Sequence, residues 1–392
     1  MASSLFAEAL PTSAELSALV AGKESSPDAL KQLADDLRSK YSGQPIPESV
    51  RMLISIAQGG LMGGSDGWFG PAQSKFDWKS LAEMHQIPIH GSIHADRFRG
   101  SPEWFVRLDR NRDGAITAED LDWSDSNPWV QHAYVVNRLL RRLDTKGNGT
   151  LTRAEWVAFF DSVSQVGDVA SIESLREAWL TGISASFYPG DAPTQQQLVK
   201  GLLSGELGSL QEGPNLGDQA PDFTLTTQDG KQTIHLADVI GCKPVVLMFG
   251  NFTCSPFRSM YPGVEAVSRR FENDATILAI YVREAHPADG WKMESNTRLG
   301  VDVTQPKTLA ERTAVASQCS RLLNARIPLL VDEIDDRVGN AYSGMPARLY
   351  VIDHEGKITY KAGRGPFGFK VGEMEQSLVM TLMAQLPSSL VA

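Results

Sequence analysis

The stretch PVVLMFGNFTCSPF, residues 244–257, joins an apolar run to a cysteine and decides the fold. Residues 244–250 predict one strand buried on both faces. Cys254 follows, and Ser255-Pro256 predicts a helix with serine as N-cap and proline as first helical residue. At such a strand-to-helix turn, the positive end of the helix favours the thiolate, which is the reactive form of cysteine. We therefore expect a reactive thiol at residue 254, with Arg258 as a nearby cation.

Downstream of Asp222, short β-branched runs alternate with helical stretches. This alternation predicts an α/β domain with a largely parallel sheet and a final hairpin. The predicted strands are residues 244–250, 275–282, 327–332 and 348–353, and the predicted helices are residues 263–271, 308–323 and 371–386.

A second polar cluster follows the strand predicted at 275–282. It contains Glu284 and His286, which can act as an acid/base pair near neutral pH. Functional groups of open α/β sheets gather at the carboxyl ends of strands, so we expect this pair to converge with Cys254. Met345-Pro346 precedes the strand predicted at 348–353 and is a candidate cis peptide facing the thiol.

Residues 109–120, DRNRDGAITAED, match the ligand pattern of a calcium-binding helix-loop-helix unit. Such a loop needs oxygen ligands at positions 1, 3, 5, 7, 9 and 12, and a glycine at position 6. Gly114 stands at position 6, and Ile116 at position 8 predicts pairing with a second loop. The expected ligands are Asp109, Asn111, Asp113, the carbonyl of Ala115, Thr117 and Asp120.

Residues 144–155, DTKGNGTLTRAE, form a second loop of the same type. Lys146 puts a cation at a ligand position, which should weaken ion binding. We expect Leu151 to face Ile116 across the paired loops. The expected ligands are Asp144, Asn148, Thr150 and Glu155. A degenerate pair that only packs is the alternative for both loops.

Composition excludes several classes of protein. The chain has 392 residues, with 37 Lys or Arg against 47 Asp or Glu, a net charge of −10. This charge argues against nucleic-acid and anionic-lipid partners. Its 3 cysteines cannot form a disulfide scaffold, and no apolar run approaches the roughly 18 residues that a membrane span needs. We expect a multidomain cytoplasmic protein with no membrane partner and no organic cofactor.

Pattern changes along the chain predict four regions. In chain order they are a helical N-terminal region, the paired loops with their helices, a linker with short helices, and the α/β domain. Their ranges are 1–100, 101–163, 164–216 and 217–386.

Residues 101–163 resemble an EF-hand pair, and residues 217–386 resemble the iodothyronine deiodinase family, whose fold is thioredoxin-like. The second resemblance rests on VLMFGNFTCSPF, IYVREAHPADGW and MPARLYVIDHEGKITYKAGRGPF. It implies an α-helical EF-hand region followed by an α/β thioredoxin-like domain. It also implies the family's roles for five residues, namely Cys254 at the selenocysteine position, the proton-relay pair Glu284 and His286, and Arg348 and Pro346 at the substrate.

The chain departs from the family pattern at several positions. Phe252 replaces the family's cysteine two residues before the nucleophile, and the family's histidine has no counterpart around residues 305–307. The EF-hand half stands where the family has a membrane anchor. Because no CxxC motif is present, a second thiol must come from elsewhere; Cys319 is one candidate, and an external thiol is the other.

Three functions fit these residues. The first is a calcium-binding, thiol-dependent oxidoreductase that removes iodide from a halogenated phenol through Cys254 and uses an external thiol as reductant. The second is a peroxiredoxin-like peroxidase, in which Cys254 attacks peroxide. The third is a calcium-binding interaction protein whose thioredoxin-like half is a scaffold.

Overall fold

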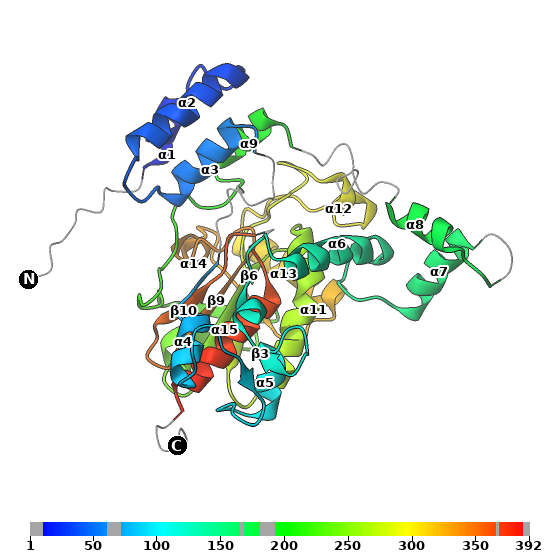
Figure 1. Ribbon diagram of the computed structural model, residues 1–392. Coiled ribbons are helices and arrows are strands. Elements are labelled where there is room, and N and C mark those ends of the chain that lie inside the picture. Colours follow the sequence, from blue (N-terminus) through cyan, green and yellow to red (C-terminus); the bar gives the residue numbers. More distant parts are fainter. Residues whose placement is uncertain (1–10, 61–71, 165–167, 181–192, 366–367, 387–392) are drawn as a thin grey trace, which may run out of the picture.

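The computed structural model describes the chain from residue 11 to residue 386 with four internal gaps, and Figure 1 shows the arrangement of its elements. Within the described residues, one eight-stranded sheet has the order β1-β10-β9-β6-β7-β8-β4-β5. The described ranges are 11–60, 72–164, 168–180, 193–365 and 368–386. The strands are β1 Gln73–Ser74, β4 Thr224–Thr227, β5 Thr233–His235, β6 Val245–Gly250, β7 Thr276–Tyr281, β8 Leu329–Val331, β9 Arg348–Ile352 and β10 Ile358–Lys361.

The sheet is mixed, so the expectation of a largely parallel sheet is wrong. Strand β6 pairs in parallel with β7, and β7 with β8, while the other pairs are antiparallel. The hairpin β9–β10 lies on the side of β6 opposite to β7, and the hairpin β4–β5 extends the sheet beyond β8. Hairpins join neighbouring strands through short turns, which requires antiparallel pairing.

The order β10-β9-β6-β7, with a helix between the parallel strands and another after the hairpin, is that of a thioredoxin-like α/β fold. The helix α11 (Ser255–Arg270) connects β6 to β7, α13 (Leu309–Leu323) leads to β8, and α15 (Val371–Ala384) follows the hairpin. All residues of β6 are buried, as its apolar sequence predicts. The predicted strands and helices of this region are confirmed to within a few residues. Helix α11 begins one residue before Pro256, the expected first helical residue, and continues through the predicted range 263–271 to Arg270.

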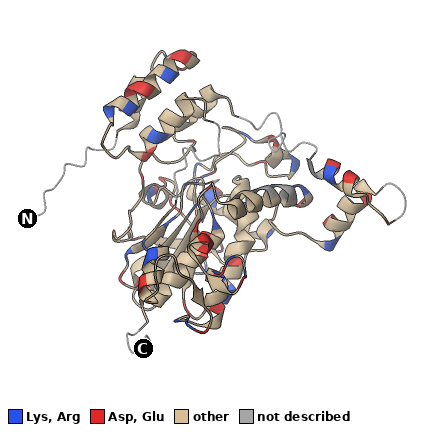
Figure 2. Cartoon of the chain, in the orientation of Figure 1, with Lys and Arg blue, Asp and Glu red and all other residues tan. Residues whose placement is uncertain are grey.

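A separate helical cluster packs against this domain. It consists of α1 (Ser13–Val20), α2 (Pro27–Lys40), α3 (Glu48–Ala57) and α9 (Gln195–Leu203), which share their own buried core. Lys and Arg are interspersed with Asp and Glu along this cluster (Figure 2). Glu48 joins the cluster to the domain through a buried ion pair with Arg364 at 3.2 Å. Among the described residues, no helix is long and apolar enough to cross a membrane.

Residues 72–121 pack into the main core instead. Strand β1 pairs with β10 at the edge of the sheet, and α5 packs on α15. The predicted range 1–100 therefore contributes to both cores. The elements of this segment are β1, α4 (Trp78–Met84), β2 (Ile93–His94), α5 (Pro102–Leu108), β3 (Ala115–Ile116) and the 3₁₀ helix η1 (Ala118–Leu121).

The partner of the first calcium-type loop differs from the one expected. Ile116 pairs with Ile93 in the two-stranded sheet β2–β3, and not with Leu151, which is 37% exposed. Strands β2 and β3 form a sheet of two strands, so β2 occupies the edge of β3 at which Leu151 was expected to pair. The strands and the 3₁₀ helix also mean that this region is not purely α-helical.

The second calcium-type loop lies between α6 (Pro128–Leu143) and α7 (Arg153–Val163), which lead on to α8 (Ile172–Leu180). Helices α7 and α8 extend away from the sheet (Figure 1). The remaining short helices are α10 (Leu236–Val239), α12 (Glu294–Arg298) and α14 (Arg337–Ala341).

Candidate active site

The cysteine that follows β6 is buried at the start of α11. Cys254 is itself the N-cap residue and only 2% exposed, so Ser255 is the first helical residue and not the expected N-cap. Burial raises the pKa of the Cys254 thiol to about 11, although a backbone hydrogen bond and the charge of Arg258 act in the opposite direction. The helix end was expected to lower this pKa, and desolvation outweighs it.

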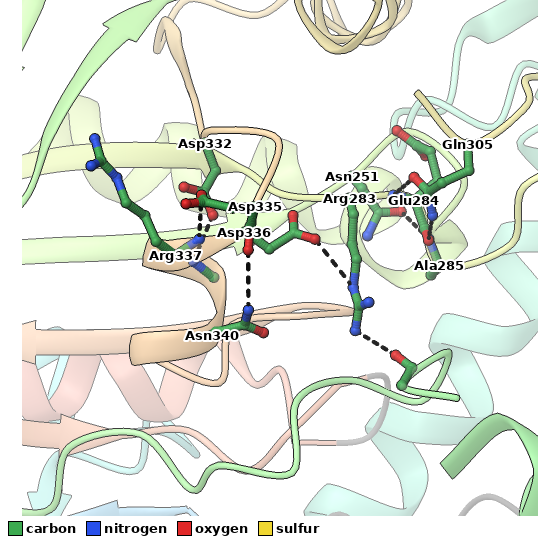
Figure 3. Close-up of polar contacts among 12 residues, drawn as sticks. Asn251, Arg283, Glu284, Ala285, Gln305, Asp332, Asp335, Asp336, Arg337 and Asn340 are labelled. Atoms are coloured by element: carbon green, nitrogen blue, oxygen red, sulfur yellow. Dashed lines mark hydrogen bonds and ion pairs between the residues drawn. The ribbon is translucent and has the colours of Figure 1, made fainter. Parts of the chain in front are cut away.

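Asn251, the first residue after β6, connects three segments around the thiol, and Figure 3 shows it beside Ala285. Its Oδ1 accepts hydrogen bonds from the amides of Cys254 at 3.0 Å and Ala285 at 3.2 Å. Its Nδ2 donates to the carbonyl of Pro346 at 3.1 Å. The Met345-Pro346 peptide is cis, as predicted. One fully buried amide therefore holds the thiol loop, the loop after β7 and the cis-proline loop together.

Glu284 is buried beside the thiol loop. Its Oε2 accepts hydrogen bonds from the Thr253 amide at 2.9 Å and from the Thr253 hydroxyl at 2.8 Å, and its Oε1 accepts one from the Tyr281 hydroxyl. Burial raises the pKa of Glu284 in spite of these hydrogen bonds, which favour the carboxylate. A carboxyl group with a raised pKa keeps its proton to higher pH than an ordinary glutamate does, which suits it to act as a general acid.

His286 is hydrogen-bonded to Thr253 through its backbone amide. Its amide donates to the Thr253 hydroxyl at 3.0 Å, and its Nδ1 lies 3.1 Å from the carbonyl of Trp291. A carbonyl only accepts hydrogen bonds, so this contact assigns the proton of a neutral ring to Nδ1. The Trp291 ring meets the imidazole edge-on, with 4.8 Å between ring centroids. The structure thus brings Cys254, Glu284 and His286 to one loop cluster.

Gln305 lies in the stretch where the family's histidine was sought. Its Oε1 accepts a hydrogen bond from the Glu284 amide at 3.0 Å, and its Nε2 donates one to the Glu284 carbonyl at 3.0 Å (Figure 3). This pair of hydrogen bonds fixes the backbone of the acid loop. Sequence reasoning missed it because a glutamine in a loop carries no local signal of its partner.

Arg258 lies one turn into α11 and is almost fully buried. Its guanidinium donates to the carbonyl of Phe252 and, at 2.8 Å, to Oδ1 of Asn296. Asn296 in turn donates to the carbonyl of Thr253 at 2.7 Å. Arg258 is therefore the cation that the sequence placed near the thiol, and it also holds the backbone that leads into Cys254.

The guanidinium of Arg348 is engaged elsewhere. It is buried against the carbonyls of Ala362 at 2.9 Å and Ser343 at 3.3 Å, and it lies 3.6 Å from the Glu48 carboxylate. The contact with Glu48 belongs to the junction with the helical cluster, and the two carbonyls belong to the domain itself. No contact described for Arg348 involves Cys254, Glu284 or His286.

The first calcium-type loop has its polar groups turned inward. The carboxylate of Asp109 accepts from the amides of Asp113 at 3.2 Å and Gly114 at 3.0 Å. Asp120 accepts from the amide of Arg110 at 3.0 Å and the hydroxyl of Thr117 at 2.9 Å.

The second calcium-type loop repeats this pattern. Asp144 accepts from the amides of Asn148 at 3.1 Å and Gly149 at 2.7 Å. Hydrogen bonds from Thr152 and Thr145 lower the pKa of Glu155 to about 2. In the part of the chain that the structure describes, no three His, Cys, Asp or Glu side chains form a ready metal cluster.

The fold and the loop cluster are those of a thioredoxin-like protein with one cysteine at the start of its first core helix. The sequence model of iodothyronine deiodinase matches residues 193–381, and that of the EF hand matches residues 103–122. The chain belongs to the iodothyronine deiodinase family.

The curated relatives are thyroxine 5-deiodinases. The human protein is 33% identical over 162 residues, covering 40% of this chain and 51% of its own, and the chicken (Gallus gallus) protein is 30% identical over 177 residues, covering 45% and 67%. The chain thus spans about half the length of most curated relatives it matches.

Similar solved structures include a thioredoxin domain from Bacteroides vulgatus and an exposed lipoprotein thioredoxin from Streptococcus pneumoniae. They are 20% and 22% identical, each with a TM-score of 0.29, and each covers 40% of this chain. The matches cover 94% and 98% of those chains, respectively.

Proposed function

We propose that the chain is a thiol-dependent oxidoreductase that removes iodide from an iodinated phenol. The observation that carries this proposal is the buried network in which Thr253 contacts both Glu284 and His286 and adjoins Cys254. Family membership supports the same chemistry.

In the proposed reaction, the Cys254 sulfur attacks the iodine atom. The carbon–iodine bond breaks, a sulfur–iodine bond forms, and the aryl carbon takes a proton from Glu284 through His286. An external thiol then attacks the iodinated sulfur and releases iodide, and a second thiol reduces the mixed disulfide to restore Cys254. Two thiols are oxidised to one disulfide for each carbon–iodine bond reduced.

The raised pKa of Cys254 makes loss of the thiol proton part of this reaction. At neutral pH a thiol with a pKa of about 11 is protonated, and the thiolate is the nucleophile. The neighbouring carboxyl of Glu284, linked to the thiol loop by Thr253, is the group we assign to move protons here.

The test is iodide release from iodinated tyrosine and iodinated thyronine with dithiothreitol as reductant. We expect Cys254→Ala to abolish release and Glu284→Gln to reduce it by a factor of about 100 or more, as for loss of a general acid. Cys242→Ala is the matched control, because Cys242 is exposed and lies before β6. Iodide release by Cys254→Ala at the wild-type rate would refute the proposal.

A thiol peroxidase is the second candidate, and the position of Cys319 favours it. Cys319 is fully buried on α13, and burial raises the pKa of its thiol well above the ordinary value. The charges of Glu284 and Cys254 act in the same direction, and that of Arg258 acts against them. Both thiols lie in the same hydrophobic core and influence each other electrostatically. After one equivalent of hydrogen peroxide, a Cys254–Cys319 disulfide would support this function with Cys319 as resolving thiol, whereas Cys254 sulfenic acid alone would exclude that resolving role.

We also propose that the first loop binds Ca²⁺. Its carboxylates, amide, hydroxyl and carbonyl are the oxygen ligands that this ion prefers. Gly114 has φ +90°, as the sharp turn at position 6 requires. The ligands would be those expected from the sequence, Asp109 to Asp120, and the ion would order the loop beside α15.

A further inference from the structure

The second calcium-type loop packs directly on the helix that begins at the candidate nucleophile. A Cβ atom added to Gly149 would lie 2.7 Å from the carbonyl oxygen of Ser259 and 2.8 Å from that of Arg258. A Cβ atom added to Gly147 would lie 2.6 Å from the side chain of Leu299. The loop therefore fits closely against α11 at Gly149 and against the end of α12 at Gly147, and neither glycine leaves room for a side chain.

Arg258 connects this loop to the thiol. Its Nε donates to the carbonyl of Gly147 at 3.4 Å, and the other end of its guanidinium holds Phe252 and Asn296. Asn296 holds the carbonyl of Thr253. One buried cation thus contacts the loop on one side and the backbone before Cys254 on the other.

We propose that Ca²⁺ bound by the loop 144–155 increases the reactivity of Cys254, with Arg258 as the positioning residue. The proposal deepens the proposed function, because it assigns regulation to the same thiol. The ion would be held by Asp144, Asn148, Thr150 and Glu155. Asp144, Asn148 and Glu155 already accept hydrogen bonds from amides of this loop.

The direction of the effect follows from the charges that face Arg258. These are Cys319, Cys254, Glu284 and Asp144, each of which attracts the guanidinium in its ionised form. Ca²⁺ would neutralise Asp144 and Glu155, so the guanidinium would interact more with the Cys254 thiolate. Each unit by which a pKa falls raises the thiolate fraction tenfold below that pKa, so half a unit gives about a threefold faster alkylation.

The test measures the rate of Cys254 alkylation by iodoacetamide at pH 9, with peptide mass spectrometry, in excess Ca²⁺ and in EGTA. We expect Ca²⁺ to accelerate alkylation about threefold in the wild type. Asp144→Asn should remove this response, whereas Asp109→Asn in the first loop should retain it. Calorimetric titration with Ca²⁺ reports binding to each variant independently of the thiol.

Arg258→Lys and Arg258→Met distinguish a role of the Arg258 charge toward Cys254 from a role of its side chain in packing alone. Arg258→Met should still bind Ca²⁺ but lose the acceleration, and Arg258→Lys should restore part of it because it keeps the charge. If Arg258→Met does not fold, Asp144→Asn decides, since it leaves Arg258 in place. No acceleration in the wild type, or acceleration that survives Asp144→Asn, would overturn the proposal. Failure of iodide release with an intact calcium response would refute only the proposed reaction.

Discussion

Replacing Glu48 by glutamine should loosen the junction between the helical cluster and the thioredoxin-like domain. Glu48 is 4% exposed, and its two carboxylate oxygens lie 3.2 Å from Arg364 and 3.6 Å from Arg348. Glutamine keeps the size of the side chain but removes the charge. Two buried guanidinium groups would then lose their anion.

The size of the effect follows from what these arginines retain. Removing one partner of a buried ion pair costs about 3–5 kcal/mol. Arg364 keeps hydrogen bonds to Ser209 and Ser343, and Arg348 keeps those to Ala362 and Ser343. Because these acceptors remain, we expect the lower end of this range, about 3 kcal/mol.

The assay is urea unfolding at pH 7, followed by circular dichroism, with Glu83→Gln as the matched control. Glu83 forms an ion pair with Lys79 at 3.9 Å, but both side chains are about 70% exposed, so its loss should cost less than about 1 kcal/mol. A Glu48→Gln protein as stable as the control would show that the buried ion pair does not stabilise the junction.

The pH dependence gives a second test of the same ion pair. Burial alone would raise the pKa of Glu48, but the charges of Arg364 and Arg348 outweigh it, so the folded-state pKa lies below its ordinary value. The stabilisation is therefore complete above the ordinary pKa and is lost as the pH falls through the lower folded value. The difference between wild type and Glu48→Gln should shrink in acid, and an unchanged difference would contradict this reasoning.

Three further predictions concern the thiol, its supporting amide and the first loop. With a pKa of about 11, Cys254 should react with iodoacetamide at pH 7 more slowly than the exposed Cys242, as peptide mapping would show; faster labelling of Cys254 would contradict the effect of burial. Asn251→Ala should destabilise the fold by about 1–3 kcal/mol, because buried amides lose their acceptor, and should lower iodide release more than Asn324→Ala does on the surface. Ca²⁺ should raise the melting temperature of the wild type relative to EDTA, and Asp109→Ala should reduce this shift; an equal shift in both proteins would exclude Asp109 as a ligand.

Local sequence alone determined the elements of the thioredoxin-like half. The apolar run at 244–250 predicts a buried strand. The short β-branched runs and helical stretches around it predict the alternation of strands and helices in this half. The convergence of Cys254 with Glu284 and His286 was also predictable, since the carboxyl ends of adjacent parallel strands meet at one edge of a sheet. The ligand spacing of the first loop likewise appears within twelve consecutive residues.

Only the tertiary structure decided which segments meet. Ile116 pairs with Ile93 because β2 occupies that edge, and the second loop packs on α11 because Gly149 allows a close approach. The pKa of Cys254 is raised because its surroundings exclude water, a property that depends on every segment packed around it and on no local motif. Partners distant in sequence are selected by packing and burial, and a pattern that is local in the chain contains no information on either.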